Sequence, residues 1–385
     1  MLMKILHLII DHQVVERTMG IYEKVFPGCN DFVIIDLYQS PIKHLSRLKE
    51  MKLINRGMGL KEGKSFDFSP YSHIVAHFMS MDSIDFIKSV PDNIHVCWEI
   101  YGWDLYDQFL VDKGIKLYYT NKYKYSKYFL LHTYAAGFID FIHYLKGDKY
   151  CLKYQKRKQF KYIINRVDSI QYCCKYDAVY VENFSSREIP SYEIFNYALS
   201  IVLGDLKDCT FYEGRNIMIG NSASFSNNHL YVLDHIKELK VPSGLKIILP
   251  LSYGGIPQYS KEIVDKYTEV FSNNNITILK DYLPIHEYNQ ILASLNSIVL
   301  SAWRQESQGT AIMGFYLGIK VVMSERSPLY KWFKEIGFIV FTIENINIDD
   351  LFTPLSMSDK KHNRNIVIER YSDEVFERTL QEKFK

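Results

Sequence analysis

Residues 216–221 read NIMIGN and residues 297–303 read SIVLSAW. Each short apolar run is followed by a polar turn and then by apolar residues at helical spacing, SASFSNNHLYVLDHI after the first run and RQESQGTAIMGFYLG after the second. Continuous apolar strands that alternate with amphipathic helices are typical of parallel sheets buried on both faces. The pattern therefore predicts a doubly wound α/β domain in the second half of the chain.

The same alternation extends over the whole sequence. The other runs expected to form strands lie at 4–10, 31–37, 72–78, 93–100 and 177–183 in the first half, and at 245–251, 276–282, 320–326 and 338–343 in the second. A chain of 385 residues suits two domains of about 200 residues each. With a linker at 205–215, we expect an N-terminal domain at 1–208 and a C-terminal domain at 209–385, whose last helix can pack back on the first domain.

The composition is that of a globular protein, with 47% hydrophobic and 23% charged residues. No apolar run reaches the ~18 residues that a membrane-spanning helix needs, and the first residues lack the cleavage site of a signal peptide. The six cysteines form no C-x-x-C pair, which indicates reduced thiols in a cytosolic protein. The sequence has no D-x-D, no phosphate-binding G-x-x-x-x-G-K-[ST] loop and no G-x-G-x-x-G after the first strand, so we expect neither a metal nor a cofactor.

Charge is unevenly distributed, although the net charge is only +2. Between residues 113 and 166 there are thirteen Lys or Arg residues and two acidic residues, with ten tyrosines among them. Three interpretations are open: a solvated helical face, a surface that docks on anionic lipid, or a surface that binds nucleic acid. We favour docking on the anionic inner membrane surface, because Tyr prefers the interface and polybasic segments are attracted to it. The near-neutral net charge argues against a nucleic-acid partner.

The two polar turns quoted above follow strands of the same predicted sheet. Ligands of such sheets bind beyond the carboxyl ends of the strands, where each following helix offers free N–H groups to an anion. Asn221 and Ser222 begin the first turn, and Arg304, Gly309 and Thr310 belong to the second. Arginine can hold a diphosphate through two hydrogen bonds, and glycine lets the backbone approach it. The alternative is that these are turn and N-cap residues only.

Three stretches of the second half resemble a known family. They are IGNSASFSNNH at 219–229, ILPLSYGGIPQYSKEI at 248–263 and WRQESQGTAIMGFYLGIKVVMSERSPLYKWF at 303–333. Together they resemble the TDP-N-acetylfucosamine:lipid II N-acetylfucosaminyltransferase family of enterobacterial common antigen assembly. In the first half, WEIYGWDLY at 98–106 looks like the family's W-x-I-W-G-x-D-L-Y motif, and SHIVAHF at 72–78 resembles a strand ending in His-Gly. The match runs in order along most of the chain but is dense only in these stretches.

The resemblance implies a GT-B glycosyltransferase, in which two Rossmann-like domains face a central cleft. The C-terminal domain would bind a nucleoside-diphosphate sugar, with a dTDP-sugar favoured and N-acetylfucosamine or another deoxy-amino sugar transferred. The N-terminal domain would bind a lipid-linked saccharide used in bacterial surface polysaccharide synthesis. The enzyme would act without a metal, in the cytoplasm and peripherally on the inner face of the membrane.

The donor motifs of the family can be carried over residue by residue. They match this chain at Arg304, Gln305, Gly309 and Thr310 (R-Q-x-x-x-G-T), at Asn221 and Ser222 (G-N-S), and at Pro250 and Tyr253 (P-x-x-Y). We therefore assign donor binding to Asn221, Ser222, Tyr253, Arg304, Gly309 and Thr310. The chain departs from the family at Ser307, where members carry glycine, and in the length and basicity of 113–165.

Displacement of a nucleoside diphosphate needs an acceptor hydroxyl made nucleophilic by a base, or a stabilised oxocarbenium ion. Asp11 and His12 follow the first predicted strand and are the first candidates for the base. Asp104 is another, although it can equally N-cap the helix beginning LYDQFL. His77 and Glu99 end two other strands, and we assign both to the acceptor site. A single histidine or acid at such a place is usually structural.

Aromatic residues of the same motif are the last candidates. Trp98 can stack on a sugar ring of the acceptor, although packing in the core is an equal alternative. Three rival functions also stay open. They are a GT-B transferase with a different sugar and a soluble carbohydrate acceptor, a nucleic-acid-binding protein that uses 113–166, and a catalytically inert scaffold that binds a sugar or nucleotide.

Overall fold

The structure is a computed structural model that describes residues 4–35, 53–56, 65–110, 115–119, 152–195 and 198–384, with a few single positions between these ranges. The chain forms two compact units. The first contains residues 1–115, 134–201 and 371–385, and the second contains 116–133 and 202–370. The linker expected at 205–215 lies just after the division at 201, and the last residues of the chain belong to the first unit.

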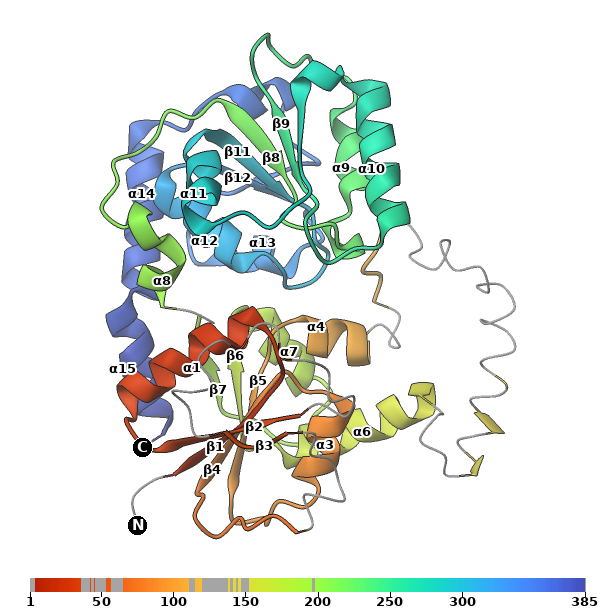
Figure 1. The fold of residues 1–385 in the computed structure, drawn as a ribbon, viewed down its shortest axis with the longest axis vertical. Helices are drawn as coiled ribbons and strands as arrows, with labels where there is room; N and C mark the ends of the chain where they lie inside the picture. The colour runs from red at the N-terminus through yellow and green to blue at the C-terminus, as the bar shows by residue number, and fades with distance from the viewer. Residues whose placement is uncertain are drawn as a thin grey trace. The chain divides into compact units, whose positions relative to one another are not determined.

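The first unit is built on a seven-stranded sheet in the order β3-β2-β1-β4-β5-β6-β7, with every neighbouring pair parallel (Figure 1). Its strands are β1 Ile5–Ile9, β2 Asn30–Ile34, β3 Leu53–Arg56, β4 His73–His77, β5 His95–Glu99, β6 Ser169–Tyr172 and β7 Ser191–Glu193. The two central strands pair directly, with Ile5 opposite His73. The chain reverses its direction of travel across the sheet between β1 and β4, which makes this the topological switch point.

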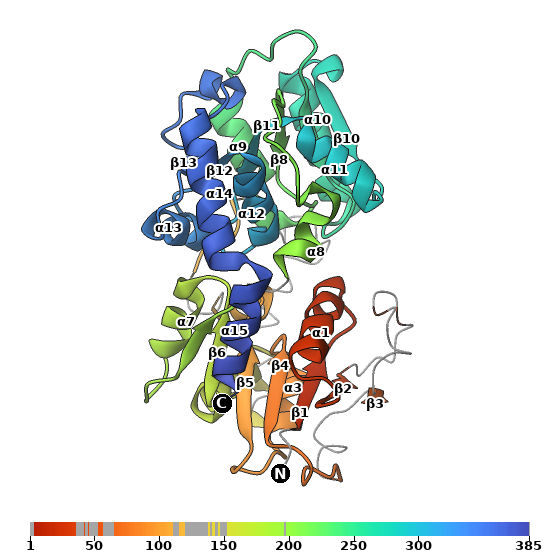
Figure 2. The same cartoon turned by 90° about the vertical axis from the view of Figure 1, so that its left-hand side faces the viewer.

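Helices cover the sheet of the first unit. They are α1 Gln13–Val25, α3 Met81–Ile87, α4 Trp103–Leu105, α6 Leu152–Arg166, α7 Lys175–Glu182 and α15 Asp373–Lys383, and α8 Leu199–Leu203 lies at the division between the units. The C-terminal helix α15, labelled in Figure 2, packs against α1 and β7. Its Phe376 and Leu380 enter one buried cluster with Ile5 and Tyr22, so the last residues help to close the core of the first unit.

One expected strand of the first unit is wrong. Residues 177–183 belong almost entirely to α7, and the strands in this region are β6 and β7. The sequence DAVYVEN has the β-branched and aromatic residues of a strand. Its buried residues, Asp177, Ala178 and Val181, instead recur at the spacing of a helix face, so tertiary packing overrides the local propensity.

The second unit contains a six-stranded sheet in the order β10-β9-β8-β11-β12-β13, again all parallel. Its strands are β8 Asn216–Ile219, β9 Ile247–Pro250, β10 Ile276–Leu279, β11 Leu295–Leu300, β12 Lys320–Met323 and β13 Phe341–Thr342. Its helices are α9 His229–Ile236, α10 Pro257–Val270, α11 Ile285–Ala293, α12 Gln308–Leu317, α13 Pro328–Glu335 and α14 Met357–Tyr371. The switch point lies between β8 and β11.

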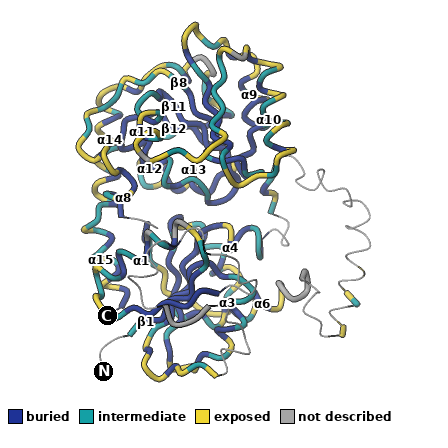
Figure 3. The backbone as a smooth tube through the Cα atoms, in the orientation of Figure 1, coloured by how far each residue is buried: buried dark blue, intermediate teal, exposed yellow. Residues whose placement is uncertain are grey.

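The strands at the centre of both sheets are buried along their length (Figure 3). In the second unit, Ile217, Ile247 and Val299 from three neighbouring strands join one apolar cluster with Tyr259 and Tyr267 of α10. Fully burying such a side chain stabilises a fold by about 1.5–3 kcal/mol. These clusters hold each sheet rigid, and they fix the loops that leave its carboxyl edge. The predicted pair of doubly wound α/β domains is confirmed.

The segment expected to dock on lipid is described only in part. Residues 113–114, 120–137, 139–140, 143–144 and 147–151 lie outside the described residues, and α6 contains most of what is described. No helix within the described ranges is long and apolar enough to cross a membrane.

Candidate functional site

The first loop of the candidate site leaves β8 at Gly220 and reaches α9 at His229. Gly220 has a φ of +72°, which other residues adopt at a cost, and a Cβ there would lie 2.6 Å from Nε2 of His229. The loop then folds on itself, because Asn227 accepts a hydrogen bond from the backbone N–H of Asn221 (3.1 Å) and donates one to Oγ of Ser222 (3.0 Å). Asn221 and Ser222 are thereby fixed at the carboxyl end of β8.

The second loop, which follows β9, packs directly on the first. The backbone N–H of Ala223 donates to the carbonyl of Tyr253 (2.7 Å), and Nδ2 of Asn221 lies 3.4 Å from the hydroxyl of Tyr253. A Cβ at Gly255 would lie 2.2 Å from the carbonyl oxygen of Ala223, so only glycine allows this approach. The structure thus brings Tyr253 together with the donor candidates Asn221 and Ser222. Tyr253 is 56% exposed.

The third loop joins β11 to α12 and contains the remaining donor candidates. Arg304 is buried at the start of this loop, and Gly309 and Thr310 lie in the first turn of α12. Ser307, the N-cap residue, has a φ of 66°, in the left-handed region that L-residues adopt at a cost. Thr310 hydrogen-bonds to the side chain of Tyr288 on α11. The first backbone N–H groups of a helix lack intrahelical partners, so this end of α12 suits an anion.

Side chains connect the first and third loops across the switch point. Arg304 contacts Glu306, with Nε and an Nη nitrogen 3.1 Å and 3.0 Å from Oε2. The same guanidinium lies 3.3 Å from Oγ of Ser226. Nδ2 of Asn227 lies 3.4 Å from the other oxygen of Glu306. One carboxylate is therefore held between donors of both loops.

Several buried polar atoms around these loops have no hydrogen-bond partner within the part of the chain that the structure describes. They are Oδ1 of Asn221, both ring nitrogens of His229, Oγ of Ser301, Nε1 of Trp303, Oε1 of Gln305 and Oγ of Ser307. A buried polar group without a partner destabilises a fold by about 1–3 kcal/mol. Such groups therefore tend to be satisfied by a ligand or by water, and their concentration here points to a binding site.

Two further features shape the electrostatics of this edge. Burial lowers the pKa of His229 to about 3, so the imidazole is neutral at physiological pH and can either donate or accept a hydrogen bond. Beside Arg304, the ring of Trp303 carries the guanidinium of Arg326 at 4.3 Å and Nζ of Lys116 at 5.5 Å from its centroid. Three cationic groups therefore gather at the carboxyl end of β11.

The carboxyl edge of the first unit holds the candidates for the base. Asp11 and His12 follow β1; Asp11 accepts a hydrogen bond from the backbone N–H of Leu45 (3.1 Å), and His12 is exposed. The ring of His12 lies 5.3 Å from that of Phe78, which stacks on Tyr101 at 4.3 Å. Both candidates are thus at the switch point of their sheet, where solvent reaches them.

Beneath this edge lies a buried network that contains two acceptor candidates. Nδ1 of His77 lies 2.9 Å from Oε2 of Glu99, and Nε2 of His77 lies 2.9 Å from Nδ1 of His7. His7 also contacts Oδ1 of Asn30 (3.0 Å), and Tyr101 donates its hydroxyl proton to Glu99 (2.6 Å). His77 and Glu99 are fully buried.

The pKa values of this network follow from its burial and charges. Burial acts to raise the pKa of Glu99, but the adjacent His77 and the hydrogen bond from Tyr101 outweigh it, so the pKa lies below its usual value. Burial and the neighbouring His77 lower the pKa of His7. The network therefore contains an ionised carboxylate that is held by its partners and closed to solvent.

Asp104 and Trp98 are also fully buried. The carboxylate of Asp104 accepts hydrogen bonds from Nε1 of Trp98 (2.8 Å) and from the backbone N–H groups of Met79 (3.0 Å) and Tyr101 (3.0 Å). Burial raises the pKa of Asp104, and these hydrogen bonds partly offset the rise. The geometry matches a carboxylate that joins the turns after β4 and β5, and the ring of Trp98 packs in the core.

The sequence left several participants of the second unit unnoticed. Ser226, Asn227 and His229 lie in the stretch quoted for the first loop, and Glu306 lies in the R-Q-x-x-x-G-T motif. Their signal was only that they are polar residues near a strand end. Because turns are rich in such residues, the contacts between loops were needed to identify them.

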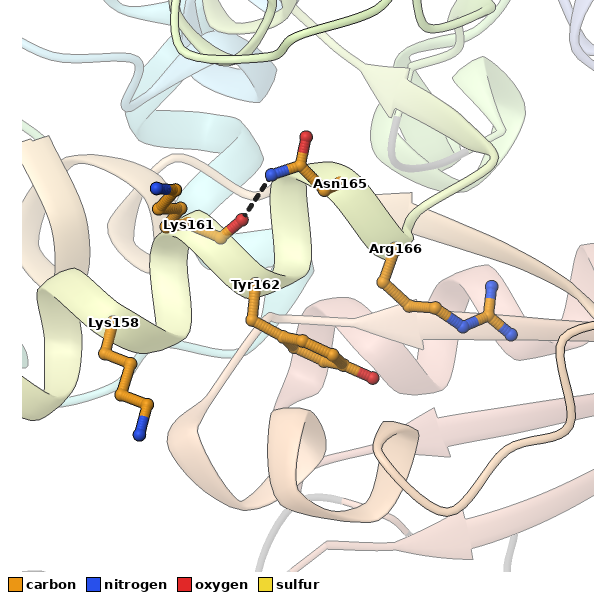
Figure 4. Close-up of a pocket in the computed structure, with 5 residues that line it drawn as sticks. All are labelled: Lys158, Lys161, Tyr162, Asn165 and Arg166. Atoms are coloured by element: carbon orange, nitrogen blue, oxygen red, sulfur yellow. Dashed lines mark hydrogen bonds between the residues drawn. The ribbon is translucent and has the colours of Figure 1, made fainter. Parts of the chain in front are cut away.

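A separate hollow of about 430 Å³ lies along α6 and is lined by Lys158, Lys161, Tyr162, Asn165 and Arg166 (Figure 4). Lys158, Tyr162 and Arg166 point to the same side of the helix. Arg166 pairs with Asp168 at 3.0 Å, and the two lysines are exposed. Within the described ranges, no group of three or more His, Cys, Asp or Glu side chains is placed to hold a metal ion.

Comparison with protein families gives a match over residues 149–362, more than half of the chain. The matching family is described as 4-alpha-L-fucosyltransferase, glycosyl transferase group 56. The matched region includes all three loops of the second unit.

Solved structures share the fold at low sequence identity. The Anabaena protein HepE, solved with UDP and glucose, has a TM-score of 0.61 at 12% identity over 99% of both chains. Sucrose-phosphate synthase from Thermosynechococcus elongatus has a TM-score of 0.64 at 10% identity, over 99% of this chain and 98% of its own. The lipopolysaccharide outer core galactosyltransferase WaaB has a TM-score of 0.57 at 10% identity, over 98% of both chains. The expected GT-B fold, with two Rossmann-like domains, is confirmed.

Proposed function

Because the chain belongs to the 4-alpha-L-fucosyltransferase family, glycosyl transferase group 56, we propose that it transfers a deoxy-amino sugar from a nucleoside diphosphate to a lipid-linked saccharide. Family membership makes the chain a glycosyltransferase. The nature of the donor, the sugar, the acceptor and the membrane contact are proposals that rest on the residues below and on the resemblance described above.

The donor site of this proposal is the carboxyl edge of the second sheet. The observation that carries it is the contact between Arg304 of the β11 loop and Ser226 of the β8 loop, across the switch point. Asn221, Ser222 and Tyr253 border the same edge from β8 and β9, while Gly309 and Thr310 offer the first N–H groups of α12. The unpartnered polar atoms of these loops would be satisfied by the phosphates and by hydroxyl groups of the donor.

The chemistry required of the donor site is stabilisation of the leaving group. The bond between the anomeric carbon and the diphosphate oxygen breaks as the acceptor oxygen bonds to that carbon, and negative charge accumulates on the nucleoside diphosphate. A guanidinium and a helix N-terminus held in place before reaction stabilise such charge without reorganisation. Arg304 and α12 can therefore do the work that a divalent cation does in enzymes with a D-x-D motif.

For the general base we propose Asp11 or His12. Both lie at the switch point of the first sheet, and His12 is exposed. A base in this position contributes about 10²–10⁴-fold to the rate. Asp104 is less suited, because its carboxylate is fully buried and is held by three donors of its own unit. His77, Glu99 and Trp98 would support the acceptor site from beneath.

The lipid-linked acceptor and the membrane contact are supported by charge. Helix α6 has the sequence LKYQKRKQFKYIINR, which contains six cationic residues and no acidic one. Its hollow between Lys158 and Arg166 combines positive charge with the ring of Tyr162, a combination suited to the anionic interface of a membrane. We propose that this surface docks at the inner face of the cell membrane, near the acceptor.

Vesicle sedimentation tests the membrane contact. Wild type should bind vesicles with anionic lipid at low salt, release them at high salt, and ignore neutral vesicles, because the attraction is screened over about 8 Å at physiological ionic strength. Lys158→Glu with Lys161→Glu should weaken binding. Equal binding to both lipids, or none to either, would remove the membrane proposal, and salt-sensitive binding to oligonucleotides would favour the nucleic-acid alternative.

A panel of nucleoside diphosphates and nucleotide sugars tests the reaction itself. Thermal shifts with dTDP, UDP and GDP, and with their sugars, should single out one base, since a ligand at 100 times its Kd adds about 2.7 kcal/mol to the free energy of unfolding. HepE was solved with UDP, which makes UDP the natural rival of dTDP. Transfer assays with lipid-linked and water-soluble saccharides then separate the two acceptor classes. The absence of binding by every nucleotide would refute the proposal.

A further inference from the structure

We infer that the carboxylate of Glu306 occupies the place of the donor's phosphate on Arg304. This carboxylate must leave Arg304 before a nucleoside diphosphate can bind. The inference rests on the proposed donor site and adds to it a competing anion supplied by the chain itself. Glu306 would therefore set the affinity of the site for diphosphates.

The geometry shows one anion held by several donors. Oε2 of Glu306 lies 3.0 Å and 3.1 Å from two nitrogens of Arg304, and Oε1 lies 3.4 Å from Nδ2 of Asn227. These donors come from the loops after β11 and β8, which flank the switch point of the sheet. The side chains of Arg304 and Glu306 are only 10% and 15% exposed, so water screens the pair weakly.

A phosphate and a carboxylate accept hydrogen bonds from the same donors. Both accept charge-assisted hydrogen bonds from the planar fork of an arginine, and the edge of Arg304 formed by Nε and one Nη nitrogen, which holds Glu306, can bind only one of them at a time. A diphosphate brought beside Glu306 would also meet a like charge in a largely buried place. Binding of the donor thus requires that Glu306 moves away from Arg304.

The backbone next to Glu306 is suited to such a move. Ser307 has a φ of 66°, a conformation that an L-residue keeps only where neighbouring contacts enforce it. The pair between Arg304 and Glu306 lies directly before this residue in the loop. Exchange of the carboxylate for phosphate would release Glu306, while the guanidinium of Arg304 stays in the position in which it binds the phosphate.

Calorimetric titration with UDP, dTDP and inorganic pyrophosphate tests the inference on the full chain. Glu306→Gln keeps the size of the side chain and removes its charge, so each diphosphate should bind on the order of tenfold more tightly than to wild type. Uridine and thymidine, which lack phosphate, should bind both proteins equally. Glu238→Gln is the matched control: it removes the same charge from an exposed position beyond the far end of α9, and should change nothing.

A double-mutant cycle ties the effect to the pair. In the Arg304→Ala background, Glu306→Gln should give a much smaller gain than in the wild-type background, because the contact that it relieves is already gone. The melting temperature of each variant shows that the fold is intact, and Glu306→Ala serves as a second variant should Glu306→Gln fail to fold.

The outcomes separate the two hypotheses. Diphosphate binding that is unchanged or weaker in both Glu306 variants overturns the role of Glu306 as a competing anion while the donor site stands. Weaker binding of nucleotide sugars alone would mean that Glu306 contacts the sugar, which also overturns it. If no protein in the series binds any diphosphate, the proposed donor site is wrong and the inference falls with it.

Discussion

The two sheets share one order over six strands and one kind of switch point, yet the polar side chains discussed at their carboxyl edges differ in how fully they are paired. At the carboxyl edge of the first sheet, Glu99 and Asp104 are fully buried and held by hydrogen-bonding partners within their own unit. At the equivalent edge of the second sheet, Asn221, Gln305 and Ser307 each leave a buried polar atom without a partner among the described residues.

This difference teaches how to separate structural polar residues from binding ones. A buried group with a complete set of partners holds the fold together, and its loss should destabilise the protein without touching ligand affinity. A buried polar group that lacks a hydrogen-bond partner contributes little to the stability of the fold, and its loss should mainly change the affinity for a ligand.

The largest effect should follow Glu99→Ala in the first unit. Removing this carboxylate leaves His77 and Tyr101 without their buried partner, and breaking such a pair costs about 3–5 kcal/mol. Hydrogen exchange of β4 and β5 should therefore accelerate strongly, while exchange in β11 stays as in wild type. Asp85→Ala, which removes an exposed partner of Lys88, is the control and should change the free energy of unfolding by less than about 0.5 kcal/mol.

The same variant has a pH signature. The pKa of Glu99 lies below its usual value in the folded state, so its contribution is present above the unfolded pKa of about 4.3 and is lost as the pH falls through the folded pKa. Glu99→Ala should accordingly lose less stability than wild type on acidification below pH ~4. Unchanged exchange of β4 and β5 at neutral pH would show that the network is not structural.

Arg304→Ala should have the next largest effect, on nucleotide binding. Loss of a charged hydrogen bond to the diphosphate costs roughly 1.5–3 kcal/mol, so the affinity for the nucleotide should fall tenfold or more. The variant should still fold, with a melting temperature lowered by the loss of the contact to Glu306. Arg215→Ala lies at the amino end of β8, on the opposite edge of the sheet, and should leave affinity unchanged. Equal nucleotide affinity of Arg304→Ala and wild type, measured by calorimetry, contradicts the donor assignment.

An intermediate effect is expected from acidification of the second unit. Burial holds the pKa of His229 at about 3, below the unfolded value, so the unfolded chain binds more protons and stability falls as the pH drops below about 6.5. At pH ~5.5 this one residue should remove about 1.4 kcal/mol. Hydrogen exchange of β8 at pH 7 and 5.5 measures the slope, which should be smaller in His229→Gln. An equal slope in both proteins would mean that His229 is protonated in the fold or reached by solvent.

A smaller effect should follow Ser307→Gly. Glycine relieves the left-handed backbone but adds freedom to the unfolded chain, so the free energy of unfolding should rise by no more than about 1 kcal/mol. Asn228, with a φ of 48°, is the contrasting case, because its side chain bonds to the carbonyls of Ser301 (3.0 Å) and Leu117 (3.3 Å). Asn228→Gly should therefore destabilise the unit. Destabilisation by Ser307→Gly would instead show that its hydroxyl supports the fold.

The smallest expected effect is none at all. If Arg304 and α12 neutralise the leaving group, the rate of sugar transfer should be the same with EDTA as without it. Activity that disappears with the chelator and returns with Mn²⁺ or Mg²⁺ would show that a metal does this work.

The sequence predicted the fold better than the site, for a physical reason. Strands buried on both faces, such as IIL at 247–249, have a continuous apolar sequence that identifies them, whereas the short strands β3, β6 and β7 of three or four residues were not predicted. The loops after β8 and β11 could be found from the residues, because strand ends and turn residues are local signals. The contacts of Glu306 could not be predicted, since they depend on how two loops distant in sequence meet.

The polar residues of the first unit illustrate the same limit. His77 and Glu99 end neighbouring strands, and in the sequence their position at a strand end is like that of Asp11 and His12. Only burial separates the two pairs: the first pair is inside the core, and the second lies at the rim. Position along a strand predicts that a side chain lies near the edge of a sheet, but not whether it is covered.

The most direct test of the central claim is a crystal structure of the protein with a nucleoside diphosphate. We expect the diphosphate to lie within hydrogen-bonding distance of Arg304 and the first N–H groups of α12, with Glu306 turned away and the buried network of Glu99 unchanged. A nucleotide bound elsewhere, or bound while the contact between Arg304 and Glu306 stays intact, would contradict it.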